Sequence, residues 1–145
     1  MVNGHSDRIN CLASSPRAAG YESRFVSCGI DQTLRVWHTG GWLLEQHVHD
    51  TRCDSTGVLQ CAFSATGAWL VSVASELSVY RVQIRPSGRL VLSIHQRLAA
   101  ICGAEGLRAA AFCCNGDAIA VGSRDGVLGL WTKYPGSPPD VADAH

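Results

Sequence analysis

The chain has 145 residues, 46% of them apolar, and this composition predicts a packed globular protein rather than a disordered one. Twelve basic residues balance twelve acidic residues, which disfavours partners held by net positive charge, such as nucleic acid or an anionic membrane. The apolar runs are too short for a transmembrane helix and the N-terminus lacks the pattern of a secretory signal, so we expect an intracellular protein, cytoplasmic or nuclear.

The first part of the chain, residues 4–49, is predicted to form a unit of four strands. These strands are rich in β-branched, aromatic and aliphatic residues and cover 8–13, 24–29, 33–37 and 42–47. Gly29 and Asp31 predict a tight turn between the second and third strands, because glycine accepts positive φ and aspartate bonds nearby backbone amides.

A second unit, residues 50–98, repeats the pattern less regularly. Its predicted strands cover 58–64, 69–73, 77–80 and 89–94. Ala74 stands where the first unit has its turn aspartate, so this unit is a degenerate copy.

The third unit, residues 99–134, is predicted to be incomplete. Strands at 118–121 and 127–131 flank an Asp-Gly pair, which is a strong hairpin signal. Prolines cannot donate to a strand ladder, so we expect a flexible proline-rich tail over 135–145 and no outer strand. A short helix over 96–108 is the competing interpretation, which Gly103 and Gly106 disfavour.

Each unit ends its third strand on an aromatic residue: Trp37, Tyr80 or Trp131. The spacing is close to the period of roughly 40–45 residues that four-stranded propeller blades show, with extra residues around 85–96 lengthening the second interval. The sequence therefore predicts an all-β protein of about three four-stranded antiparallel blades.

The first unit resembles a WD40 repeat, whose signature is a Gly-His pair, a turn aspartate and a Trp-Asp pair. Those places are taken by Gly4, His5, Asp31 and Trp37, while His38 replaces the final aspartate. The resemblance covers residues 4–132 and implies a partial WD40-type β-propeller whose last blade lacks its outer strand. The degenerate blades are also similar to those of large multi-repeat scaffolds of the telomerase-associated or NACHT-WD type.

The resemblance further implies a structural hydrogen-bond network that ties the loop before a blade to its inner hairpin. By position, the members of this network are His5, Ser27, Asp31 and Trp37. Such a network satisfies a buried carboxylate that would otherwise be costly to desolvate. The third unit keeps Asp125 and Trp131 but has Val121 at the serine position, so we expect its network to be incomplete.

No enzymatic or metal chemistry is expected. Serine, histidine and aspartate also form hydrolase triads, but no GxSxG-type elbow surrounds Ser27. His47, His49 and Cys53 form an HxHx3C cluster without an evident fourth zinc ligand. The seven cysteines include no CxxC pair, so we predict reduced core residues and neither a metal site nor a cofactor.

Three blades are too few to close a ring, because propellers typically use 4–8. Uncovered outer faces would expose more apolar surface than a soluble monomer tolerates. We therefore expect a fragment or isoform of a longer protein, or a subunit that completes a ring with another chain.

The predicted function is a non-catalytic protein–protein interaction scaffold that recruits partners into a larger complex, with no small-molecule substrate. WD40 rings commonly bind partners through the loops before first strands and the turns between second and third strands. By position, this resemblance implicates Ile30, Gln32, His49, Arg52 and Arg124. The alternative is an RNA- or ribonucleoprotein-binding module, in which arginine and aromatic side chains contact single-stranded RNA.

Overall fold

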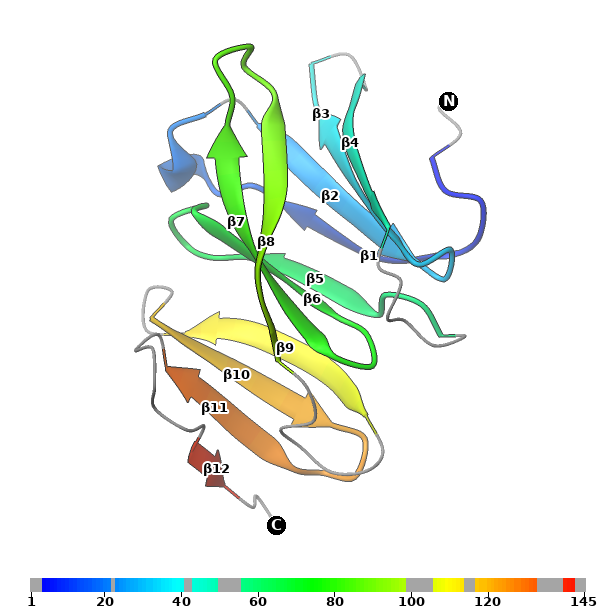
Figure 1. Ribbon diagram of the computed structural model, residues 1–145, viewed down its shortest axis with the longest axis vertical. Helices are drawn as coiled ribbons and strands as arrows, with labels where there is room; N and C mark the ends of the chain where they lie inside the picture. Colours follow the sequence, from blue (N-terminus) through cyan, green and yellow to red (C-terminus); the bar gives the residue numbers. More distant parts are fainter. Residues whose placement is uncertain are drawn as a thin grey trace.

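The computed structural model describes residues 4–21, 23–40, 43–49, 56–98, 106–113, 117–132 and 140–142. The chain forms three antiparallel sheets of four strands each, in which every strand pairs with its neighbour in sequence. The all-β architecture is therefore as predicted, and the second sheet lies between the other two (Figure 1). Within the described part of the chain, no helix has the length and apolarity needed to span a bilayer.

The first sheet consists of β1 (Ile9–Ser14), β2 (Arg24–Gly29), β3 (Thr33–His38) and β4 (Leu43–His49). A short 3-10 helix, η1 (Arg17–Ala19), connects β1 to β2. Phe25 lies opposite Trp37 and Ser27 opposite Arg35, so the register of β2 and β3 is fixed from end to end. Side chains alternate between two faces along each strand. Ser27 and Trp37 therefore share the face that points away from the second sheet.

The second sheet consists of β5 (Gln60–Phe63), β6 (Trp69–Val73), β7 (Leu77–Ile84) and β8 (Leu90–Leu98). The long β7–β8 hairpin accounts for the extra residues that separate the second and third repeats. Gln96 belongs to β8, whereas the competing interpretation placed it in a helix, and residues 99–105 of that candidate helix lie outside the described residues. Tyr80 on β7 pairs with Leu70 on β6, just as Trp37 on β3 pairs with Phe25 on β2 in the first sheet.

The third sheet consists of β9 (Leu107–Cys113), β10 (Ala118–Ser123), β11 (Leu128–Thr132) and β12 (Asp140–Ala142). The prediction that this blade has no outer strand is corrected by β12, which pairs with β11 over three residues. The predicted tail over 135–145 thus contains a strand. Its prolines, at 135, 138 and 139, all precede Asp140, so from that residue onward the backbone amides are free of proline and can join a ladder.

Two apolar cores lie between the sheets. The first joins the first and second sheets and includes Val26, Leu34, Leu70 and Tyr80. The second joins the second and third sheets and includes Val71, Leu77, Ile119 and Val121. The second sheet is therefore buried on both faces, as expected for a blade between two others.

Polar side chains also fasten the first sheet to the second. The guanidinium of Arg24 pairs with the carboxylate of Glu45 (Nε to Oε2, 2.9 Å) and donates to the carbonyl of Gly88 at 2.8 Å. Both charged side chains are almost fully buried, so each needs the other as a partner. Beside them, the Gln46 amide bonds the backbone amide and carbonyl of Leu92.

Candidate functional site

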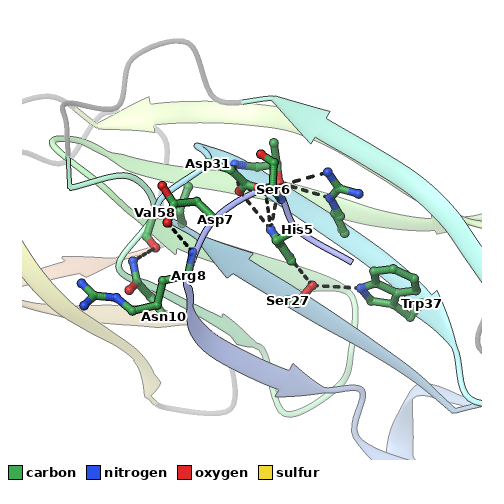
Figure 2. Close-up of polar contacts among 11 residues, drawn as sticks. His5, Ser6, Asp7, Arg8, Asn10, Ser27, Asp31, Trp37 and Val58 are labelled. Atoms are coloured by element: carbon green, nitrogen blue, oxygen red, sulfur yellow. Dashed lines mark hydrogen bonds and ion pairs between the residues drawn. The ribbon is translucent and has the colours of Figure 1, made fainter. Parts of the chain in front are cut away.

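A chain of buried polar side chains lies on the open face of the first sheet (Figure 2). His5 comes from the segment before β1, Ser27 from β2, Trp37 from β3 and Asp31 from the β2–β3 turn. The structure brings all four residues together. Gly4 packs directly beside the Trp37 ring, where an added Cβ would lie 3.3 Å from the nearest ring atom, so the small residue allows this close approach.

The distances define one consistent set of donors and acceptors. Trp37 Nε1 donates to Ser27 Oγ at 2.9 Å, and Ser27 Oγ lies 2.6 Å from His5 Nε2. His5 Nδ1 lies 2.9 Å from both carboxylate oxygens of Asp31. An indole N–H can only donate, so Ser27 Oγ accepts from Trp37 and donates its own hydroxyl hydrogen to His5 Nε2. The imidazole then carries its hydrogen on Nδ1 and donates it to the Asp31 carboxylate.

Asp31 is the best satisfied member of this network. Its oxygens also accept from the Thr33 hydroxyl at 2.8 Å, the Thr33 amide at 3.2 Å and the Ser6 amide at 3.1 Å. Burial alone would raise the pKa of Asp31, but the hydrogen bonds from His5, Thr33 and Ser6 outweigh it and lower the pKa below its usual value. The carboxylate is therefore ionised at neutral pH and pins the segment before β1 to the β2–β3 turn.

The order Ser27–His5–Asp31 has the connectivity of a hydrolase triad, but its surroundings differ from those of an active site. Ser27 is 2% exposed, and its oxygen already accepts a hydrogen bond from Trp37. A nucleophilic serine needs access to a substrate carbonyl and donors that stabilise the resulting oxyanion. The buried geometry instead gives each polar group a partner, which is what structural networks require.

The second blade keeps parts of the network. Strand register places Ser72 at the position of Ser27. Ala74 stands at the position of Asp31 only when residues are counted back from Tyr80, because the turn of this blade is two residues shorter. The Ser72 hydroxyl is buried and has no hydrogen-bond partner among the described residues. Ser72 therefore does not reproduce the role of Ser27, and the sheet packs into an apolar core on each of its faces.

The third blade does not join its two predicted network residues. Asp125 accepts a hydrogen bond from Ser123 within the β10–β11 turn, whereas Trp131 Nε1 is buried without a partner among the described residues. Val121 takes the position of Ser27, so the acceptor that serves Trp37 is missing here. Among the residues that the structure describes, Asp125 thus makes a local turn contact and the Trp131 indole N–H has no acceptor.

The residues predicted to bind partners lie at different places. Ile30 and Gln32 belong to the β2–β3 turn and are partly buried, and Gln32 has a φ of 65°. Arg124 is exposed in the β10–β11 turn. His49 ends β4, with its side chain outside the described part, and Arg52 and Cys53 lie outside the described residues altogether.

The three turns that join second to third strands lie on one side of the molecule, at the right in Figure 1. We call this surface the turn face; it comprises residues 29–32, 74–76 and 124–126. Its composition mixes polar, acidic and basic side chains, including Gln32, Glu76, Arg124 and Asp125. Asp31 belongs to the first of these turns, where its carboxylate bonds His5 from the segment before β1 (Figure 2).

A model of the WD40 family, described as WD domain, G-beta repeat, matches residues 1–38 and 95–132. These segments make up more than half of the chain, so the protein belongs to the WD40 family. Repeats of this family are typically non-catalytic and generally act as interaction scaffolds. Comparison with curated protein sequences gave no match. Neither matched segment contains β5, β6 or β7, in agreement with the degenerate polar network of the second blade.

Proposed function

We propose that the protein is a non-catalytic scaffold that binds protein partners through the turn face. The observation that carries this proposal is the buried network behind the β2–β3 turn. Four polar contacts at 3.1 Å or less hold Asp31 and Thr33 against His5 and Ser6 of the segment before β1. Three more tie His5 to Ser27 and Asp31 to Thr33, all at 3.2 Å or less. A pre-organised surface loses less conformational entropy on binding, which favours affinity.

The composition of the turn face supports a protein partner rather than a polyanion. Arg124 lies next to Asp125, and Glu76 occupies the neighbouring turn, so no positive stripe follows the surface. Nucleic-acid partners require several basic groups to displace counterions from phosphates. Mixed charge with exposed arginine suits the polar rim of a protein–protein interface.

The outer sheet faces provide a second contact surface. Leu12 is 63% exposed on the open face of the first sheet, and Leu128 is 49% exposed on that of the third. In a propeller both faces would contact neighbouring blades. We propose that further blades, or sheets of a partner, cover them.

The test is a charge reversal on the turn face, paired with the same change elsewhere. Arg124→Glu alters the turn face, whereas Arg85→Glu alters the exposed β7–β8 turn at the top of Figure 1. Proteins captured from a cell lysate by tagged full-length chain are quantified by mass spectrometry for wild type and both variants. We expect at least one specific partner to fall tenfold or more with Arg124→Glu and to persist with Arg85→Glu.

Identical partner profiles for all three chains would contradict the role of the turn face. If the captured material is instead RNA, its release by raised salt and by ribonuclease identifies the alternative, because phosphate contacts weaken as salt rises.

A further inference from the structure

Three cysteine side chains that play no part in the polar network meet between the first and second sheets. Cys11 lies on β1, Cys28 on β2 and Cys61 on β5, and their Sγ atoms all lie within 4.8 Å of one another. Cys11 and Cys28 are direct partners across neighbouring strands, and Cys61 reaches them from the adjacent blade. The cluster therefore spans the junction between two blades.

The surroundings of these sulfur atoms are apolar. Cys28 is 0% and Cys61 3% exposed, Cys11 is partly buried, and all three thiols are free. Their polar contacts are weak: Cys11 Sγ lies 3.6 Å from the carbonyl of Cys61, and Cys61 Sγ lies 3.8 Å from the carbonyl of Val26. Among the described residues, the ligands gathered here are sulfur alone.

We propose that Cys11, Cys28 and Cys61 bind one thiophilic closed-shell cation, Zn²⁺ or Cu⁺, which links the first blade to the second. Soft thiolates select these ions over Mg²⁺ or Ca²⁺, which require oxygen ligands. With metal–sulfur bonds of about 2.3 Å, tetrahedral geometry places sulfur atoms roughly 3.8 Å apart. The sulfurs must therefore approach one another by about 1 Å or less, which small side-chain rotations provide. Solvent at the partly exposed Cys11 supplies the fourth ligand that Zn²⁺ requires.

The hydrogen bond between two of these thiols sets their pKa values apart. Hydrogen bonding with the Cys61 thiol lowers the pKa of Cys11 to about 6, and the same shared proton raises the pKa of Cys61. Thiols that bind the cation release their protons to solvent as it binds.

The test titrates the reduced, metal-free full chain with Zn²⁺ and, in a parallel anaerobic arm, with Cu⁺. We expect one equivalent of at least one of these ions to stay bound through gel filtration and to raise Tm, while Mg²⁺ does neither. Cys11→Ser should weaken binding at least tenfold, and Cys113→Ser, on β9 outside the cluster, should leave it unchanged. Retention of neither ion, or equal weakening by both variants, overturns the proposal.

A second measurement on the wild-type chain covers the case in which Cys11→Ser fails to fold. Iodoacetamide modification is followed at each cysteine by peptide mass spectrometry, with and without the ion. The bound ion should slow modification of Cys11 at least tenfold and leave that of Cys113 unaltered. An unchanged rate at Cys11 overturns the proposal independently of any variant.

Discussion

Ser27 and Ser72 occupy the same position in consecutive blades but differ in what their hydroxyls bind. Ser27→Ala leaves the buried Trp37 N–H and His5 Nε2 without partners, so the free energy of unfolding should fall by about 1–3 kcal/mol. Ser72→Ala removes a hydroxyl that has no partner among the described residues, so we expect a change below about 0.5 kcal/mol. Urea denaturation of both variants checks this, and equal losses would contradict the structural role of Ser27.

Asp31 should make stability depend on pH in the acidic range. Its pKa is lowered in the folded chain, so the stability it contributes is fully present above the usual value of 3.8 and is lost as pH falls through the folded pKa. The difference in Tm between wild type and Asp31→Asn should therefore be largest near neutral pH and shrink below about pH 4. Thermal melts of both chains across this pH range test the prediction. A Tm difference that widens as the pH falls would contradict the ionised, hydrogen-bonded state of Asp31.

Trp131 lacks the acceptor that Ser27 gives Trp37, and Val121 stands in that place. Val121→Thr offers a hydroxyl to the indole N–H of Trp131, which has no partner among the described residues. Val71→Thr is the matched control, because Val71 is equally buried in the same core. We expect Val121→Thr to cost about 1 kcal/mol less than Val71→Thr in the free energy of unfolding, the worth of one hydrogen bond. Equal costs would show that the new hydroxyl does not reach Trp131.

Sequence can predict single residues of the site where a local motif places them. His5, Ser27, Asp31 and Trp37 were placed by position in one repeat, and the structure brings them together. The cysteine cluster and the Arg24–Glu45 pair were not predicted. Their partners lie on different strands or sheets, and no local spacing encodes how those elements pack.

At the level of elements, Gly57, which precedes β5, makes a tight contact with the first blade. Its φ is 68°, and a Cβ there would lie 2.5 Å from the Gly29 carbonyl oxygen and from Ile30 Cα. Gly88 has a similar φ of 82° with nothing within 4 Å of its Cβ position. Gly88→Ala should cost about 1 kcal/mol from backbone strain, whereas Gly57→Ala adds a clash with backbone and should cost at least about 2 kcal/mol more. Denaturation midpoints of similar size for both would contradict this packing.

Most strands were predictable because alternating β-branched and aromatic residues, bounded by Gly and Asp turns, mark them. The lengths of β7 and β8 exceed the prediction, because polar residues such as Gln83 and Gln96 continue the ladder on a solvent-facing hairpin. β12 was missed because three residues after a proline-rich segment carry no periodicity of their own.

For the whole molecule, repeat spacing predicted three blades, and the structure arranges them with the second in the middle. The open faces remain uncovered at Leu12 and Leu128. We expect the isolated chain to self-associate as its concentration rises, since exposed apolar patches attract one another. Replacing both leucines with lysine should shift the light-scattering mass towards the monomer. A monomeric wild-type chain at all concentrations would contradict the proposal that these faces are contact surfaces.

The central claim is that Ser27, His5 and Asp31 hold a binding surface in place and perform no hydrolysis. Reaction of the native chain with a fluorophosphonate serine probe, followed by peptide mass spectrometry, tests this claim most directly. Because Ser27 is buried and bonded to Trp37, we predict no modification of Ser27. Covalent labelling of Ser27 that His5→Ala abolishes would contradict the claim and identify a catalytic triad.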